Sequence, residues 1–527
     1  MQRIKNLAPI FLILISFFVL RLLLPHSLNN DEAEQVLAAQ EFVLGYPKQP
    51  PLYSWLVRSI SIVLGYDLAN IYILNGLKFF FFAVFIYFLY LSAELIFTDE
   101  FYQGRSTERI SLSCNPAFLV LSGILLFISY FYDFMRDLTH SILAAMFSSV
   151  AFYVYLKLWL KPNLFKYIVL GIVFGLGMLS KYNFIFFALS MVAASLVERK
   201  AFQLLFNWRS SLSLISCILV FSPNLFYLAE MKLSAVNYAL ERSAIANTTL
   251  TQFTWWNLLK LPLMAFYEII MVISILILIF YPVVKWERVR NYFFTDDLLV
   301  TAKLRRYIFF LGLFSILIPL LIMFATAATK FYAKWLSVSS FLVVFSFFTL
   351  IDFKLLLTRT DFQIRKFVLY LIVIGCFIAS ALVFIIAGFY PDLIGRVAKT
   401  QYPYVNIAKL LREKYPAKVY FTANNDSVLE ANLILAFIKD NEKTEIKASR
   451  DVTPGIYVWD AKLYGHNPQK VFLKNNKRNL DTASQAIAGF PLDLKSLSCK
   501  VYKLNYINSR KQYYELGVCE ITPKPYI

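Results

Sequence analysis

A cluster of carboxylates follows the first apolar segment of the chain, in the stretch NNDEAEQVLAAQEFVLGYPKQPPLYSWL (29–56). Asp31 and Glu32 are adjacent, and a Pro pair with an aromatic run closes the stretch. A carboxylate can take the proton from a hydroxyl group, which is general-base chemistry. Asp31 also fits a helix N-cap with Glu34 as its capping-box partner, a pairing that leaves Glu32 without a role. Both interpretations place Asp31 at the start of a helix, and they are compatible.

Three turns between apolar segments carry further ionisable side chains at predicted membrane depth. Charge at such positions is costly and is therefore a default sign of function. A single lysine there also fits a side chain that reaches for the lipid headgroups, but three basic turns on the face that carries Asp31 favour a shared site. The turns FMRDLTHSIL, GLGMLSKYNF and ATKFYAKWL contribute Arg136, Asp137, His140, Lys181, Tyr182, Lys330 and Lys334, the last two on one face if helical.

Together these groups suit transfer from a lipid-phosphate-linked sugar. A carboxylate would activate the acceptor hydroxyl, and nearby cations would neutralise the phosphate while it is bound and as it leaves. Such a donor combines a good leaving group, an apolar anchor and a polar head. Direct displacement at its anomeric carbon would invert the configuration there.

The composition identifies a membrane protein. Of the 527 residues, 59% are hydrophobic, 17% are aromatic and only 16% are charged, and the mean hydropathy is +0.60. Apolar runs long enough to cross a bilayer predict about eleven helical spans. The first is expected as a retained span rather than a signal peptide, because no small-residue cleavage site follows it. The predicted spans are 8–24, 68–97, 115–132, 138–157, 167–180, 183–197, 212–229, 259–281, 307–325, 335–352 and 367–390.

The net charge of +19 reflects topology rather than nucleic-acid binding. With a cytosolic N-terminus, Lys and Arg concentrate in the cytosolic loops and are sparse in the opposite short loops, which is the positive-inside pattern. This orientation places Asp31 and the three basic turns on the outer side of the membrane. A nucleic-acid partner is therefore not expected.

The fold class is predicted as mainly α, a polytopic membrane bundle with a C-terminal soluble α/β domain. Residues 1–390 form the bundle, and residues 391–527 form the soluble domain on the outer side. The first outer loop, 25–67, has room for two short helices, predicted at 31–44 and 52–64. The tail is predicted to hold helices at 404–415 and 427–439 and strands at 418–423, 455–461, 499–506 and 513–521.

The cysteines and the 3 histidines show no metal-binding spacing. Cys114, Cys217 and Cys376 lie in or beside predicted spans and fit small core residues. Cys499 and Cys519 lie in the tail, where an oxidising compartment favours a disulfide between them.

The first loop resembles a signature of the GT-C membrane glycosyltransferases. An acidic pair after the first span is followed by a helix, by Gly-Tyr, and by a Pro-Pro-Leu-aromatic-x-Trp run. RDLTHSIL and GLGMLSKY are similar to the next two landmarks of these enzymes in the same order, and AKWLSVSSF is a weaker match to a later one. The likeness covers the membrane half. It is greatest to the bacterial branch of the dolichyl-phosphate-mannose–protein mannosyltransferase family, which includes enzymes that add aminoarabinose or galacturonic acid to lipid A and lipopolysaccharide core.

The resemblance implies roles for individual residues. Asp31 would be the essential carboxylate with Glu32 as its partner, and Asp137 would be the second acidic residue of the site. Lys181 would contact the lipid phosphate. The other polar residues expected to bind the donor are Lys48, Gln49, Tyr53, Arg136, His140, Tyr182, Lys330 and Lys334.

The first loop departs from the aminoarabinose transferases at one position. Those enzymes tend to have a lysine immediately before the Pro pair, whereas this chain has Gln49 there and Lys48 one place earlier. The glutamine form, together with DEAEQ, is more similar to transferases of rhizobial-type bacteria, some of which use polyprenyl-phosphate galacturonic acid. Several relatives in the wider fold bind a divalent metal near the site. The carboxylates here could do so, but no cluster of ligands demands a metal.

The sequence thus predicts a monomeric, inverting glycosyltransferase of the bacterial inner membrane with its tail in the periplasm. Its partners would be a polyprenyl-phosphate sugar, membrane lipids and an acceptor hydroxyl on lipid A, lipopolysaccharide core or another envelope glycan. A protein acceptor is one alternative. A transporter or flippase for lipid-linked substrates is another, although transporters usually place polar groups near the bilayer midplane on broken helices. A scaffold or sensor would leave the acidic loop and the lysine turns unexplained.

Overall fold

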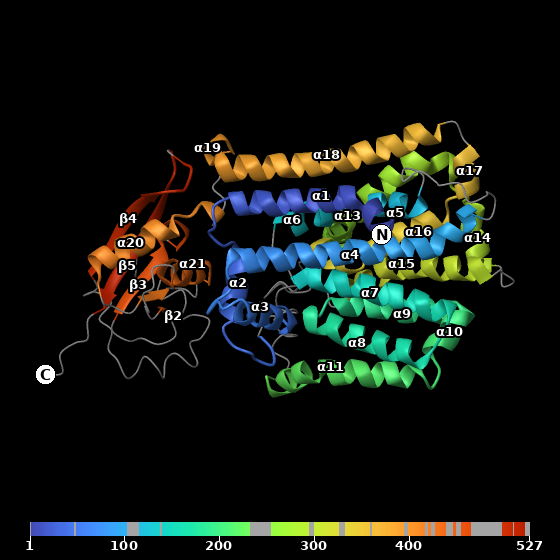
Figure 1. Cartoon of the computed structure of the whole chain (residues 1–527), viewed down its shortest axis with the longest axis horizontal. Coiled ribbons are helices and arrows are strands. Elements are labelled where there is room, and N and C mark those ends of the chain that lie inside the picture. The colour runs from blue at the N-terminus through green and yellow to red at the C-terminus, as the bar shows by residue number, and fades with distance from the viewer. Residues whose placement is uncertain are drawn as a thin grey trace. The chain divides into compact units, whose positions relative to one another are not determined.

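The computed structural model consists of two compact units of the chain (Figure 1). The first unit comprises residues 1–17, 42–56 and 76–380, and the second comprises residues 18–41, 57–75 and 381–527. The structure describes residues 2–46, 49–102, 115–136, 140–231, 255–294, 300–325, 333–358, 361–394, 399–416, 420–422, 427–438, 446–448, 455–464, 498–509 and 511–521.

Most described residues are helical, as predicted. The helices up to residue 231 are α1 (Gln2–Leu23), α2 (Asn30–Ala38), α3 (Leu52–Val63), α4 (Ile71–Tyr102), α5 (Pro116–Ile124), the π-helical turn η2 (Ser129–Asp133), α6 (Phe134–Arg136), α7 (His140–Leu160), α8 (Leu164–Ser180), α9 (Phe184–Val197), α10 (Arg199–Leu205) and α11 (Ser210–Glu230). Those that follow are α13 (Trp255–Phe280), η4 (Tyr281–Val283), α14 (Glu287–Phe294), α15 (Val300–Ala325), η5 (Ala333–Val338), α16 (Phe341–Thr349), α17 (Phe353–Thr358), α18 (Phe362–Phe389), α19 (Pro391–Ile394), η6 (Lys399–Gln401), α20 (Tyr404–Lys414), α21 (Ser427–Ile438) and α22 (Ala461–Tyr464).

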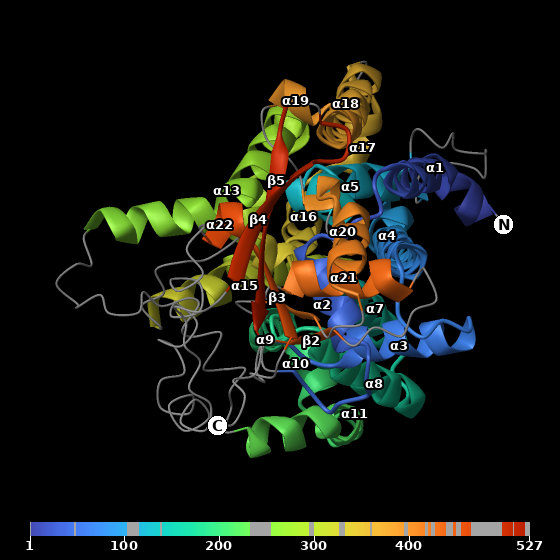
Figure 2. The same ribbon diagram turned by 90° about the vertical axis from the view of Figure 1, so that its left-hand side faces the viewer.

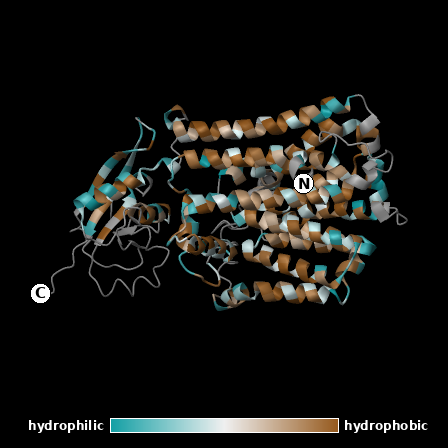
Figure 3. Ribbon diagram, in the orientation of Figure 1, coloured by the Kyte–Doolittle hydropathy of each residue, from teal (hydrophilic) through white to brown (hydrophobic). Residues whose placement is uncertain are grey.

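The first unit is a bundle of apolar helices, which are hydrophobic along most of their length in Figure 3. Within it, α8 packs against α7 and α11, and α15 packs against α9 and α16. Every residue of α16 is buried. A helix that is apolar all round and buried belongs to the core of a large protein or of a membrane bundle. These features confirm the predicted helical membrane fold.

Among the described residues, 7 helices are long and apolar enough to cross a membrane, or up to 8 if a bent pair counts as one span. The sequence predicts about eleven spans, because apolar length alone sets that number. Three of the predicted spans are shorter helices in the structure: α8 has 17 residues, α9 has 14 and α16 has 9. The α8–α9 pair is interrupted by the polar turn at Lys181 and Tyr182.

The predicted span 115–132 is a broken helix rather than a continuous one. The axes of α5 and of the segment Ser129–Arg136 differ in direction by 79°. At the break, the backbone N–H of Ser129 donates to Glu268 Oε2 at 3.1 Å, and the Ser129 hydroxyl donates to Glu268 Oε1 at 3.0 Å. A side chain that captures a backbone donor interrupts the helical hydrogen-bond ladder. The capturing carboxylate lies 139 residues away in sequence, so the local pattern does not reveal the break.

The second unit contains a five-stranded sheet with strand order β2-β1-β3-β5-β4. Strand β1 pairs in parallel with β2 and β3, and β5 pairs in antiparallel with β3 and β4. Figure 2 shows α20 and α21 on the same side of this sheet. The predicted tail helices and strands are confirmed to within a few residues, and β2 is additional. The strands are β1 (Tyr420–Thr422), β2 (Ile446–Ala448), β3 (Gly455–Asp460), β4 (Ser498–Asn505) and β5 (Tyr513–Ile521).

A disulfide joins Cys499 and Cys519 across the β4–β5 pair, where the two residues lie directly opposite each other. Cys217 and Cys376 are half-buried free thiols in α11 and α18. Cys114 lies outside the described residues.

The close approach of α8 and α11 depends on small residues. A Cβ atom added at Gly171 would overlap the Ser213 carbonyl group of α11, and one added at Gly175 would lie 2.7 Å from the Val220 Cβ. Helices within a membrane pack closely where such small residues face each other.

We therefore expect Gly171→Ala to lower the thermal midpoint of the detergent-solubilised protein, because the added methyl group must push α11 away. Overpacking of this kind typically costs about 1–3 kcal/mol, more than the helix propensity gained from alanine. Gly375→Ala is the matched control, since a Cβ there meets nothing within 4 Å. An equal midpoint for both variants would contradict the proposed contact.

Candidate active site

The acidic loop begins with a capping box whose register differs from the predicted one. The N-cap of α2 is Asn29, whose side chain accepts a hydrogen bond from the backbone N–H of Glu32 at 3.0 Å. In return, the Asn29 N–H donates to Glu32 Oε2 at 3.0 Å. The predicted box of Asp31 and Glu34 is therefore wrong by two residues, and α2 ends earlier than predicted, at Ala38.

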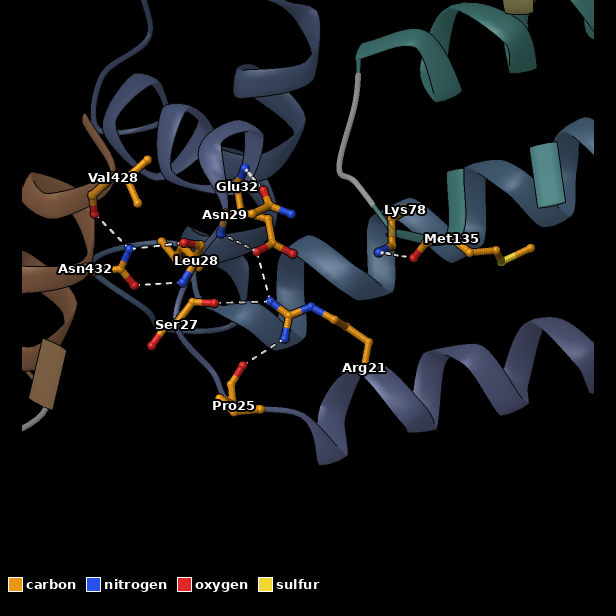
Figure 4. Close-up of polar contacts among 10 residues, drawn as sticks. All are labelled: Arg21, Pro25, Ser27, Leu28, Asn29, Glu32, Lys78, Met135, Val428 and Asn432. Carbon is orange, nitrogen blue, oxygen red and sulfur yellow. Dashed lines mark hydrogen bonds and ion pairs between the residues drawn. The ribbon is translucent and has the colours of Figure 1, made fainter. Parts of the chain in front are cut away.

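Glu32 is also the anion of a buried ion pair. Arg21 Nη2, near the end of α1, donates to Glu32 Oε2 at 2.9 Å, and the two residues are only 6% and 1% exposed (Figure 4). The same guanidinium group donates to the carbonyl oxygens of Pro25 at 3.1 Å and Ser27 at 3.4 Å. A buried charge is tolerable only when it is paired and hydrogen-bonded. Glu32 thus fixes the path of the chain from α1 into α2.

Asp31 lies next to this structural carboxylate and is itself half-buried. It belongs to the first turn of α2, whose N–H groups favour negative charge nearby. The two adjacent carboxylates therefore differ in burial. Glu32 is held inside the fold, while Asp31 retains partial access to its surroundings.

The loop segment that ends at Gly45 and Tyr46 is held by close packing in the first unit. A Cβ added at Gly45 would overlap the Tyr227 ring and would lie 2.7 Å from Asn224 Nδ2. Only glycine allows so close an approach. Asn224 Nδ2 donates to the Leu44 carbonyl at 3.2 Å, and Trp55 Nε1 donates to the Val43 carbonyl at 2.8 Å. The Trp of the signature therefore closes this loop.

Within the first unit, three of the predicted motifs meet at His140. Its ring lies 5.2 Å from that of Tyr53 in α3, centroid to centroid. Its Nδ1 donates to the Ser180 carbonyl at the end of α8, at 3.2 Å. Because a carbonyl only accepts, this bond requires a proton on Nδ1 of His140.

Lys181 and Tyr182 continue this cluster. The half-buried Lys181 Nζ donates to the Ser141 hydroxyl at 2.5 Å, next to His140. The Tyr182 hydroxyl donates to Asn224 Oδ1 at 3.0 Å, and burial raises the pKa of this hydroxyl to about 12. Tyr182 therefore stays protonated at neutral pH. Its hydrogen bond orients Asn224, which in turn binds the Leu44 carbonyl of the first loop.

The remaining predicted residues of the first unit are less concentrated. Arg136 is exposed and contacts the preceding π-helical turn η2. Its Nη1 donates to the Tyr132 hydroxyl at 3.2 Å, and its Nη2 lies 3.7 Å from Asp133 Oδ1. The carbonyl of Gln49 accepts from the Tyr46 N–H at 3.1 Å, and its buried Oε1 has no hydrogen-bond partner among the described residues. Outside the described part of the chain lie Lys48, Asp137, Lys330 and the side chain of Lys334, whose backbone forms part of the 3-10 turn η5.

Buried ionisable residues inside predicted spans were missed by the sequence reasoning, and besides Arg21 they include Lys78 and Glu268. Lys78 in α4 is 0% exposed and donates to the Met135 carbonyl at 3.0 Å (Figure 4). Glu268 in α13 is 5% exposed and holds the broken helix at Ser129. The available signal was a charged residue inside a predicted span, 68–97 or 259–281.

The broken helix is held on a second side by Tyr130. Its hydroxyl donates to the Ser337 carbonyl of η5 at 2.8 Å and lies 2.8 Å from the Ser340 hydroxyl. The turn that leads to Arg136 is thus fixed against both α13 and η5. Among the described residues, no group of three or more His, Cys, Asp or Glu side chains is placed to hold a metal ion.

Comparison with known proteins supports the resemblance seen in the sequence. A family model of dolichyl-phosphate-mannose-protein mannosyltransferases matches residues 108–227. Two lipopolysaccharide core galacturonosyltransferases of Rhizobium johnstonii match in part. RgtB is 30% identical over 231 residues, 43% of this chain and 43% of that protein. RgtA is 25% identical over 221 residues, 41% of each chain.

The matched regions therefore span less than half of either relative. Among solved structures, the oligosaccharyltransferase of Archaeoglobus fulgidus, tethered to an acceptor peptide, matches with a TM-score of 0.39 and 13% identity, over 97% of this chain and 74% of that chain. The family model and the two curated relatives confirm the predicted resemblance to bacterial GT-C membrane glycosyltransferases.

We expect Glu32→Ala to destabilise the folded protein, because it leaves the Arg21 guanidinium buried without its counter-ion. Breaking a buried pair in this way typically costs about 3–5 kcal/mol. The readout is the thermal midpoint in detergent, with Glu34→Ala on the same helix as the control. The double variant Arg21→Met/Glu32→Leu should recover part of the loss. Glu32→Ala with an unchanged midpoint would show that the pair is not structural.

Proposed function

We propose that this protein is a glycosyltransferase that moves a sugar from a polyprenyl-phosphate donor to a hydroxyl group of lipopolysaccharide core or a related envelope glycan. The observation that carries the proposal is the convergence of Tyr53, His140 and Lys181 from three distant segments into one polar cluster. The matches to the family model and to two core-modifying relatives support the same enzyme class. The positive-inside pattern of Lys and Arg in the sequence supports a reaction on the periplasmic face of the inner membrane.

The sugar we propose is galacturonic acid. Both curated relatives are named as galacturonosyltransferases, and the loop has Gln49 where a lysine would indicate aminoarabinose. The Oε1 of Gln49, which has no partner among the described residues, can accept a hydrogen bond from a hydroxyl group of the donor sugar. A negatively charged sugar would also suit the cation of Lys181 in the first unit.

Asp31 is the proposed general base. Its carboxylate takes the proton of the acceptor hydroxyl as the hydroxyl oxygen attacks the anomeric carbon. The bond between that carbon and the phosphate oxygen breaks with inversion, and the lipid phosphate leaves with the bonding electron pair. Glu32 does not share the proton transfer in this scheme. Its Oε2 is bound by Arg21 and Asn29, so it sets the position of Asp31 instead.

Lys181 is the proposed phosphate contact. Its ammonium group lies at the polar turn after α8, within hydrogen-bonding distance of Ser141. A cation there binds the donor phosphate and stabilises the charge that it carries as it leaves. His140 lies beside this cation, because its Nδ1 donates to the carbonyl of Ser180, the residue before Lys181.

We expect membranes that contain the protein to transfer labelled galacturonic acid from its polyprenyl-phosphate form to core oligosaccharide. Asp31→Asn should lower the turnover rate by about a hundredfold or more, because it removes the general base. Glu34→Gln, three residues along α2, is the control and should retain transfer. Full activity of Asp31→Asn at equal folded protein would refute the proposed base, and label recovered in the protein fraction would identify a protein acceptor.

A second expectation concerns the donor. Lys181→Ala should raise the KM for the polyprenyl-phosphate sugar by about tenfold to a hundredfold, the usual worth of a hydrogen bond from a charged group. Lys166→Ala, at the opposite end of α8, serves as the control. The measurement is initial rate against donor concentration in detergent. An unchanged donor KM in Lys181→Ala would remove this lysine from the site.

A further inference from the structure

The backbone just before α2 is bound by a side chain of the C-terminal domain. Asn432 in α21 accepts from the Leu28 N–H through Oδ1 at 2.7 Å and donates to the Leu28 carbonyl through Nδ2 at 3.3 Å (Figure 4). The amide therefore occupies both backbone hydrogen-bonding groups of one residue. Leu28 is 0% exposed and Asn432 is 5% exposed, so water does not compete at this contact.

The Asn432 side chain is itself held in place. Its Nδ2 also donates to the Val428 carbonyl of its own helix, at 2.8 Å. This bond orients the amide and distinguishes its oxygen from its nitrogen. Helix α21 packs against α2 within the second unit, so the contact belongs to a wider interface.

A second contact holds the same segment one residue earlier. The Ser27 hydroxyl donates to the Tyr402 carbonyl at 3.0 Å. The Tyr402 ring lies 5.2 Å from that of Tyr506 and 5.1 Å from that of Tyr514 in β5, centroid to centroid. Ser27 is therefore tied to a residue that is packed against the sheet.

These contacts act on the first turn of α2. Leu28 directly precedes the N-cap Asn29, and Asp31 follows two residues later in the same turn. A shift of the Leu28 backbone would move the cap and Asp31 together, because the helix turn is rigid. Misplacement of a catalytic group by about 1 Å can lower a rate by about a hundredfold.

We propose that the C-terminal domain positions the acidic motif for catalysis and that Asn432 is the positioning residue. This inference rests on the proposed function for its catalytic meaning. The domain would thus be a working part of the enzyme that sets the place of Asp31 through the backbone of Leu28.

The test compares Asn432→Leu and Asn432→Asp with the full-length wild-type protein in detergent. Leucine has a similar shape but neither bond, whereas aspartate keeps the acceptor for the Leu28 N–H and loses the donor. Asn406→Leu, at an exposed position of α20 in the same domain, is the control. Two quantities are measured: backbone amide exchange of residues 24–33 and of β3 and β5, and kcat and donor KM with polyprenyl-phosphate galacturonic acid.

In Asn432→Leu we expect faster exchange over residues 24–33, unchanged exchange in β3 and β5, and a kcat lowered about tenfold to a hundredfold with an unchanged donor KM. Asn432→Asp should fall between this variant and wild type in both readouts. Normal exchange in Asn432→Leu, or faster exchange with normal kcat, would overturn the proposal. If Asn432→Leu does not fold, wild-type kcat and exchange in Asn432→Asp would overturn it.

The two proposals fail in different ways. A wild-type protein that transfers no sugar refutes the proposed function, and the exchange comparison still decides whether Asn432 fixes the loop. A wild type that is active, with variants that match it, refutes only the role of Asn432.

Discussion

A carboxylate buried away from water must be neutralised where it lies, and the acidic loop is organised around this requirement at Glu32. One oxygen of Glu32 receives the Arg21 guanidinium and the Asn29 N–H, while the other donors of Arg21 bind the carbonyl groups of the connecting chain. The end of the first span, the connection and the start of α2 are thereby joined at a single charged centre. The neighbouring Asp31, in the same first turn of α2, takes its position from this centre.

A buried carboxylate also organises the local backbone in the helical bundle. The carboxylate of Glu268 receives both the backbone and the hydroxyl donor of Ser129, and Tyr130 reaches the Ser337 carbonyl. In a membrane, a backbone group released from a helix must find a partner within the protein. The broken span is therefore stable because distant side chains supply those partners. His140, at the start of α7, lies beside Tyr53 and close to Lys181.

Much of the fold follows from local patterns, whereas the details of the site do not. Apolar length revealed most helices, and alternation revealed β3, β4 and β5, since both signals are contained within one segment. The cap of α2 could not be settled this way, because both Asn29 with Glu32 and Asp31 with Glu34 have the spacing of a capping box. The ion pair with Arg21, 11 residues before Glu32, favours the box of Asn29 with Glu32. The break at Ser129 and the burial of Lys78 likewise depend on partners that are remote in sequence.

The bond between Leu28 and Asn432 joins residues 404 positions apart, which bears on how the protein is made. A ribosome that adds about 5–20 residues per second reaches Asn432 roughly 20–80 s after Leu28. Throughout that interval the acidic segment has already been synthesised but lacks its hydrogen bonds to Asn432. Contacts of such long range also form late in folding, because a large loop must close first. Under the proposed function, catalysis would have to wait until Asn432 has been synthesised and its helix has folded, and chains that end before Asn432 would lack the contact that positions Asp31.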